Sequence, residues 1–167
     1  MVEYTRMKTL IVLTAIAGSG KSTWANDYAS KHENVHIVSS DEIRIEVTGR
    51  YQDLDHEKEV WKRYWQYLVK YFDTDDDVTV IADSTAITNR KRLRFAPKIK
   101  NIDKKILVII RKPLDVILKQ NKMRRPDKIV PEKAIYYMVK HWQEPDWRCR
   151  RVFDEIIDVT MPTETAK

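Results

Sequence analysis

Cysteine, glycine and long apolar runs are scarce in this chain of 167 residues. Cys149 is its single cysteine, which excludes an intrachain disulfide and any multi-cysteine metal site. The four histidines show no metal-ligand spacing. No apolar run reaches the roughly 20 residues that a membrane-spanning helix needs. These absences predict a cytoplasmic protein that does not cross a membrane.

Repeats, low-complexity segments and linkers rich in proline, glycine or serine are absent as well. A chain of this length without such a linker is expected to fold as one domain with its own core. Its 43% hydrophobic and 34% charged residues are typical of a soluble globular protein. The net charge of +6 is compatible with a polyanionic substrate but does not establish one.

Two of the three glycines lie in one stretch behind the apolar run at residues 9–14. Residues 15–23 read AIAGSGKST, the order of a tight turn and a helix that opens with a lysine and a hydroxyl. Such a turn points backbone N–H groups and a positive helix end at one anion. Lys21 can reach the β- and γ-phosphates of ATP, and the Ser22 hydroxyl can bind Mg²⁺. The predicted nucleotide-binding set is Ala17, Gly18, Ser19, Gly20, Lys21, Ser22 and Thr23.

Hydrophobic periodicity predicts strands that alternate with helices. Strands are expected at residues 9–14, 35–39, 78–82, 106–110 and 155–159. Helices are expected at residues 21–31, 41–47, 57–72, 89–98, 113–120 and 131–143. This order predicts an α/β fold of the P-loop NTPase type, with a mainly parallel sheet of four or five strands covered by helices on both faces. One domain (8–160) is expected between a short extension (1–7) and a C-terminal tail (161–167).

Two carboxylates follow the second and third of these strands. Asp41 comes after the strand at 35–39, and Asp83 ends the strand at 78–82. Ligands of parallel sheets bind at the carboxyl ends of the strands, so both carboxylates are expected beside the triphosphate. Asp41 can act as a general base while Arg44, one turn later, holds an acceptor phosphate. Alternatively, Asp41 only caps its helix and pairs with Arg44. Asp83 can orient the metal or the acceptor.

Three further segments gather basic or aromatic side chains. The lid candidate, residues 121–131, either closes over the triphosphate and neutralises its charge or is a solvated basic turn. The helix at 57–72 carries two aromatic rows, which are more typical of a core than of a base-stacking surface. The helix at 89–98 carries basic residues that either track a nucleic-acid strand or form a solvated face. They are Arg90, Lys91, Arg92, Arg94 and Lys98.

Four motifs occur in order along the chain. They are AIAGSGKSTWA at 15–25, DEIR at 41–44, DST at 83–85 and LKQNKMR at 118–124. In this order they resemble the phosphate loop, the D-x-x-R element, the strand-three D-[ST]-[NT] element and the arginine-bearing lid of phage-type polynucleotide 5′-hydroxyl kinases. These enzymes are P-loop kinases of the zeta-toxin and polynucleotide-kinase type. The resemblance extends over most of the chain.

The resemblance implies transfer of the ATP γ-phosphate, with Mg²⁺, to the 5′-hydroxyl end of single-stranded DNA or RNA, as in nucleic-acid repair. It implies that Lys21, Asp41 and Arg124 are catalytic, with Asp41 as the general base and Arg124 as the lid arginine. Arg125 is the alternative lid arginine and would bind the nucleotide. The same resemblance places the metal at Ser22 and the acceptor at Arg44, Asp83 and Thr85.

Two other functions remain open on the sequence. A kinase for a small-molecule or sugar-nucleotide acceptor, similar to zeta toxins or chloramphenicol phosphotransferases, would use the same phosphate loop. An ATP-hydrolysing switch that binds nucleic acid would use it without an acceptor. A polynucleotide kinase is expected to bind oligonucleotides with a strongly salt-dependent affinity, which a small-molecule kinase lacks. DNA and RNA acceptors, and monomeric and oligomeric states, are all compatible with the sequence.

Overall fold

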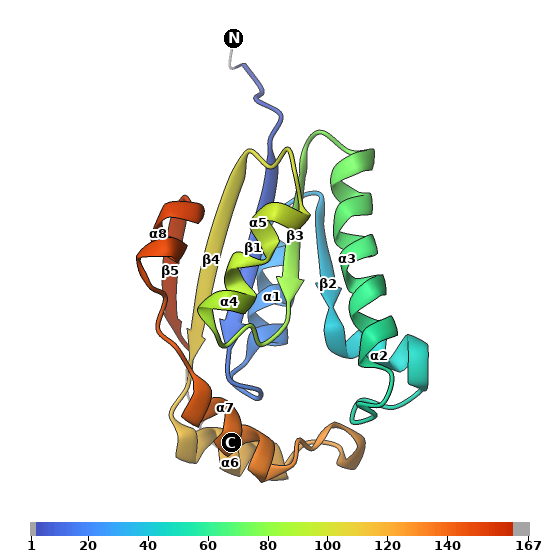
Figure 1. The fold of residues 1–167 in the computed structure, drawn as a ribbon, viewed down its shortest axis with the longest axis vertical. Helices are drawn as coiled ribbons and strands as arrows, with labels where there is room; N and C mark the ends of the chain where they lie inside the picture. Colours follow the sequence, from blue (N-terminus) through green and yellow to red (C-terminus); the bar gives the residue numbers. More distant parts are fainter. Residues whose placement is uncertain (1–2, 162–167) are drawn as a thin grey trace.

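The computed structural model describes residues 3–161, and a parallel β-sheet forms its centre (Figure 1). Within those residues the sheet has five strands in the order β2-β3-β1-β4-β5, and all neighbouring strands are parallel. The strands are β1 (Lys8–Ala15), β2 (Val35–Ser39), β3 (Val78–Asp83), β4 (Lys104–Arg111) and β5 (Glu155–Thr160). The predicted α/β fold of the P-loop NTPase type is confirmed.

Helices cover the two faces of the sheet and also its carboxyl edge (Figure 1). The helices are α1 (Lys21–Lys31), α2 (Ser40–Thr48), α3 (Glu57–Thr74), α4 (Asn89–Leu93), α5 (Phe95–Lys98), α6 (Leu114–Lys122), α7 (Glu132–His141) and α8 (Trp147–Val152). A 3-10 turn, η1 (Pro126–Lys128), lies between α6 and α7. Figure 1 shows α6 and α7 crossing below the ends of the strands, so this pair faces the phosphate loop.

Alternation along the strands decides which helices each side chain meets. In β1, Leu10 and Val12 pack in the same cluster as α3, α5 and α8. Ile11 and Leu13 pack in the opposite cluster, which contains α1. All four side chains are at most 1% exposed. Because both faces are covered, β1 reads as a continuous apolar run that ends at the phosphate loop.

The α3 helix turns one stripe of side chains toward the sheet. Its buried residues recur every four positions, which keeps them on one side of the helix. They are Val60, Tyr64, Leu68 and Phe72. Burial of such side chains contributes about 1.5–3 kcal/mol each, so this row confirms the expected core role of α3. Trp61 and Trp65 lie beside the row and are only half-buried.

The helix expected at residues 89–98 is divided into α4 and α5, with Arg94 between them. The Thr88 hydroxyl caps α4 by accepting a hydrogen bond from the Lys91 N–H. Arg92 of α4 faces the interior, where its guanidinium donates hydrogen bonds to the Thr14 hydroxyl, the Asn89 side chain and the Ile87 carbonyl. The expectation that Arg92 belongs to the basic surface is therefore wrong, since its side chain is 0% exposed.

Two expectations for the chain ends fall partly outside the described residues. Residues 1–2 of the expected extension and residues 162–167 of the expected tail are not among them. Within the described part, no helix combines the length and the apolar character that crossing a membrane requires.

Candidate active site

The phosphate loop joins β1 to α1 at the carboxyl edge of the sheet. Its backbone is left-handed at Gly18 (φ +84°) and at Gly20 (φ +97°), a conformation that residues with a Cβ rarely adopt. A Cβ at Gly18 would also lie 3.3 Å from Ile117 of α6, so α6 closes one side of the loop. No side chain caps α1, and the N–H groups of its first turn remain for an anion.

Side chains of the loop differ in their surroundings. Ser19 is buried, and its hydroxyl has no hydrogen-bond partner within residues 3–161. Ala17 and Lys21 are half-buried, whereas Ser22 and Thr23 are exposed. Residues 17–20 therefore line the turn, and the residues that follow present their polar groups at the helix start.

Ser22 and Asp83 meet where α1 begins and β3 ends. The Ser22 hydroxyl donates a hydrogen bond to Asp83 Oδ2 at 3.2 Å. Asp83 is only 5% exposed, and this burial raises the pKa of its carboxyl, an effect that the Lys21 charge opposes and the Asp41 charge reinforces. A hydroxyl and a carboxylate beside a phosphate loop are the oxygen ligands that Mg²⁺ prefers. These residues fit the metal that the sequence implies.

Asp41 and Arg44 lie next to this pair, on the first turns of α2. The Ser39 side chain caps α2, and Ser39 is the register partner of Asp83 in the neighbouring strand. Arg44 Nη1 donates to Asp41 Oδ1 at 2.7 Å. The Asp41 side chain keeps 59% of its surface exposed, against 8% for Arg44. Asp41 is thus open to solvent, while Arg44 is enclosed by the protein.

Glu57, the first residue of α3, holds the other side of Arg44. Its carboxylate accepts from Arg44 Nε at 2.6 Å and from Nη2 at 3.1 Å, and also from Trp61 Nε1 at 3.1 Å. Burial lowers the pKa of Arg44, but Glu57 and Asp41 outweigh burial and raise it. No sequence motif pointed to Glu57. The spacing of Glu57 and Trp61 shows that they share a helix face, but no local pattern connects Glu57 to Arg44 across the intervening loop.

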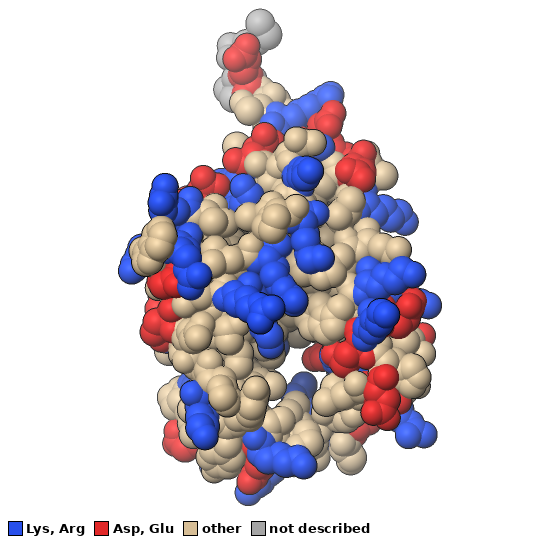
Figure 2. Space-filling view, viewed as in Figure 1, with Lys and Arg blue, Asp and Glu red and all other residues tan. Residues whose placement is uncertain are grey.

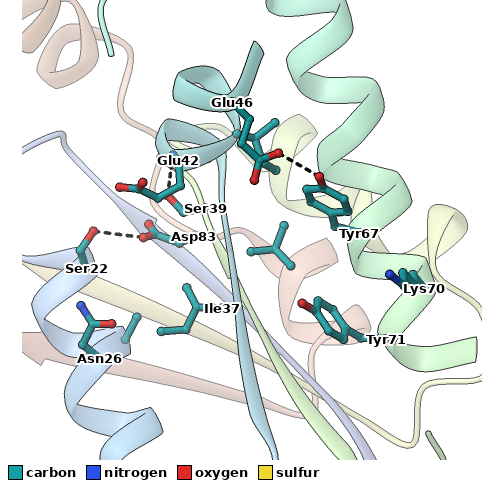
Figure 3. A pocket seen from close by; sticks show the side chains of 13 residues that line it. Ser22, Asn26, Ile37, Ser39, Glu42, Glu46, Tyr67, Lys70, Tyr71 and Asp83 are labelled. Atoms are coloured by element: carbon teal, nitrogen blue, oxygen red, sulfur yellow. Dashed lines mark hydrogen bonds between the residues drawn. The ribbon is translucent and has the colours of Figure 1, made fainter. Parts of the chain in front are cut away.

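A cavity of about 490 Å³ opens beside the Ser22–Asp83 pair, between α1, α2 and α3 (Figure 3). Figure 3 shows Glu42 and Glu46 on its α2 side, and the Glu46 carboxylate accepts a hydrogen bond from Tyr67. With Asp83, three carboxylates line the cavity, and Lys70 is the one basic residue in its lining. This charge disfavours a phosphate-bearing occupant.

The lid candidate is fastened at its base by Asn121, the buried end of α6. The Asn121 side chain donates to the Val130 carbonyl at 2.7 Å and accepts from the Val130 N–H at 3.0 Å. The guanidinium of Arg125 is exposed and forms a fork with Asp127 at 2.7 and 3.0 Å. Arg124 is half-buried, and within residues 3–161 its guanidinium forms no salt bridge. Of the two candidate lid arginines, Arg125 is the one paired with a carboxylate within residues 3–161.

Residues 84–86 continue from Asp83 and are fixed to the end of β1. The Ala15 N–H donates to the Thr85 carbonyl at 2.9 Å, and the Thr14 hydroxyl donates to the Ala86 carbonyl at 2.8 Å. Buried Arg92 then donates to the Thr14 hydroxyl at 3.1 Å. These bonds hold the half-buried Thr85 rigidly beside Asp83 and the phosphate loop.

A family model described as an AAA domain (AAA_33) matches residues 10–145 of this chain. The matched residues include the phosphate loop, Asp41, Glu57, Asp83 and the lid candidate, and they make up more than half of the chain.

Three solved structures share the fold at low sequence identity. A chain of the Pnkp1/Rnl/Hen1 RNA repair complex is 18% identical with a TM-score of 0.68, over 92% of this chain and 48% of that one. A fungal RNA kinase is 18% identical with a TM-score of 0.65, over 96% and 78%. A gluconokinase from Sinorhizobium meliloti 1021 is 14% identical with a TM-score of 0.59, over 97% and 86%. The chain spans about half the length of the chains it matches in the Pnkp1/Rnl/Hen1 complex.

Proposed function

The chain belongs to the AAA-domain family, and on that premise we propose that it is an ATP- and Mg²⁺-dependent kinase of single-stranded nucleic-acid 5′-hydroxyl ends. One observation carries the proposal. The exposed carboxylate of Asp41, paired with a buried and doubly anchored Arg44, lies beside the Ser22–Asp83 pair at the phosphate loop. Phosphoryl transfer requires this combination of a phosphate cradle, a metal-orienting carboxylate, a base and a cation for the acceptor.

Each residue has one role in the proposed reaction. The first turn of α1 and Lys21 bind the triphosphate. The acceptor oxygen attacks the γ-phosphorus in line, and its proton passes to an Asp41 carboxylate oxygen. The bond from the γ-phosphorus to the bridging oxygen breaks, and its electron pair leaves with ADP. Ser22 and Asp83 would hold Mg²⁺, which would neutralise phosphate charge. Arg124 would add a positive charge from the lid.

The charge distribution supports a nucleic-acid acceptor. The basic residues on the surface of α4 and α5 form no salt bridge with any carboxylate in residues 3–161, so their charge is available to a polyanion. They are Arg90, Lys91, Arg94 and Lys98, all of them exposed. Likeness to structures named as an RNA kinase and an RNA repair complex agrees with this choice.

A small-molecule acceptor is the second candidate, and the cavity beside Ser22 and Asp83 favours it. At about 490 Å³ the cavity is large enough for a small organic molecule. Its three carboxylates can accept hydrogen bonds from the hydroxyl groups of such an acceptor. The likeness to a gluconokinase is the corresponding structural parallel.

Transfer of labelled γ-phosphate from Mg·ATP to a short single-stranded 5′-hydroxyl oligonucleotide tests the proposal. We expect label on this strand, but none on the same strand with a 5′-phosphate and none with Lys21→Ala protein. A panel of sugars and sugar nucleotides is assayed in parallel. Label on one of these, with none on DNA or RNA oligonucleotides, would replace the proposal by the second candidate.

A further inference from the structure

A second, smaller cavity lies on the other side of the Asp83 strand end, between α3 and α4. Its volume is about 160 Å³, well below the roughly 300–1,000 Å³ typical of sites for drug-sized ligands. The lining contains three aromatic rings and two cations but no carboxylate. It consists of Trp61, Trp65, Ser84, Thr85, Ala86, Lys91, Arg94 and Phe95. We call it the α3–α4 pocket.

The aromatic walls of the α3–α4 pocket are held in place by packing. The Trp65 ring lies 4.9 Å from Phe95 between centroids and 5.7 Å from buried Tyr64. Lys98 Nζ lies 5.1 Å from the centre of the Trp65 ring. Trp61 is fixed by its hydrogen bond to Glu57. Proteins that bind single-stranded nucleic acids present rigid aromatic side chains on which the bases stack, beside cations that bind the backbone.

The pocket adjoins the candidate active site at two points. Ser84 and Thr85 of its lining follow Asp83 directly. On the opposite wall, Trp61 donates to the same Glu57 carboxylate that anchors Arg44, and Arg44 pairs with Asp41. The pocket is therefore linked to the proposed acceptor clamp, Arg44, through Trp61 and Glu57, and to the proposed base, Asp41, through Arg44.

The surface around the pocket is basic. Figure 2 shows Lys and Arg side chains gathered in the middle of the face that α4 and α5 cover, above a hollow that separates the sheet from the α6–α7 layer. The exposed basic residues of α4, α5 and the position between them are Arg90, Lys91, Arg94 and Lys98. A small pocket for one flat ring system thus opens onto a surface for phosphates.

We propose that the α3–α4 pocket binds the nucleobase of the 5′-terminal nucleotide of the acceptor, while the basic residues of α4 and α5 bind the phosphates that follow. The proposal rests on the proposed function, because it specifies how the same site would take single-stranded nucleic acid. Stacking against an aromatic side chain does not depend on the identity of the base. Thr85 and Ser84 lie where they can bind the sugar or the base edge.

A cycle between protein and substrate tests this proposal. Two acceptors are compared, a 5′-hydroxyl oligonucleotide and its counterpart that lacks only the 5′-terminal base. Three proteins are compared, the wild type, Trp65→Leu and, as a matched control, Trp147→Leu at an exposed position of α8. Loss of the base is expected to raise the wild-type KM for the acceptor roughly 5- to 150-fold, with the KM for ATP unchanged. Trp65→Leu is expected to raise it comparably for the complete oligonucleotide and to abolish the difference between the two acceptors. Trp147→Leu is expected to behave as wild type.

The outcomes separate this proposal from the proposed function. Transfer that is equally efficient with and without the terminal base in wild type would overturn the pocket assignment, whatever the stability of the variants, and leave the kinase proposal intact. If no transfer occurs with either acceptor, the kinase proposal fails. The affinity for a fluorescent oligonucleotide then tests whether the pocket binds the terminal base. Binding that weakens on loss of the base and on Trp65→Leu supports the pocket, and binding indifferent to both overturns it.

Discussion

Glu57→Gln isolates the contribution of the anchor that positions Arg44. The Arg44 side chain is 8% exposed and that of Glu57 is 32% exposed. Breaking a buried ion pair costs about 3–5 kcal/mol. Because Glu57 is about one-third exposed and Arg44 keeps Asp41 as a partner, screening reduces this figure, and we expect a loss of about 2 kcal/mol of unfolding free energy. For a chain of this size that corresponds to a Tm about 4–8 °C lower.

Thermal unfolding with Glu59→Gln as the control measures this loss. Glu59 lies on the same helix, but its pair with Arg63 is exposed, at 45% and 40%, and such pairs contribute at most about 1 kcal/mol. In transfer assays Glu57→Gln is expected to raise the KM for the oligonucleotide while the KM for ATP stays the same. Equal Tm values for the two variants would refute the claim that Glu57 holds a buried guanidinium in place.

Three further predictions concern charged residues elsewhere in the site and at its border. Burial raises the pKa of Asp83, so its ionised form destabilises the fold. Asp83→Asn is therefore expected to raise the metal-free Tm at pH 7, and this gain is expected to disappear below the ordinary pKa of 3.8. The same variant is expected to lower turnover at least about 100-fold. Arg124→Ala is expected to reduce kcat roughly 1,000-fold and Arg125→Ala far less, and the reverse order would exchange their roles. Hydrogen bonds from Arg111 lower the pKa of Glu144 from 4.5 to about 2. Glu144→Gln is therefore expected to lower the free energy of unfolding by about 0.5–1 kcal/mol at neutral pH. Thermal melts at a series of pH values are expected to show this loss above pH 4.5 and its disappearance as the pH falls toward 2.

Local patterns predicted the elements that carry the phosphate loop. The bounds of α1 and β2 are those that periodicity predicts, because a left-handed Gly20 ends the turn and polar residues surround a short apolar strand. The placement of Asp83 beside Ser22 also followed from the rule that ligands lie at the carboxyl ends of parallel strands. Both are consequences of residues near in sequence or of general sheet geometry.

The sequence did not predict the contacts between elements that are distant along the chain. Glu57 reaches Arg44 only because the loop after α2 brings the start of α3 back to it. Arg92 looks like a surface cation in a basic helix. Its guanidinium nevertheless points inward, donates to the Thr14 hydroxyl and lies 4.9 Å from the centre of the Trp142 ring. At Arg44 and Arg92, contacts with residues distant in the sequence decide where the side chain lies, and local sequence patterns do not predict those partners.

The rate of phosphate transfer by Asp41→Asn protein tests the central claim most directly. Single-turnover transfer to a 5′-hydroxyl oligonucleotide is measured together with the Kd for ATP, and Asp27→Asn, in an exposed pair with Lys31 on α1, serves as the control. If Asp41 takes the acceptor proton, its replacement lowers the transfer rate by roughly 100- to 10,000-fold and leaves the Kd for ATP nearly unchanged, while Asp27→Asn behaves as wild type. Transfer by Asp41→Asn at the wild-type rate would contradict the account.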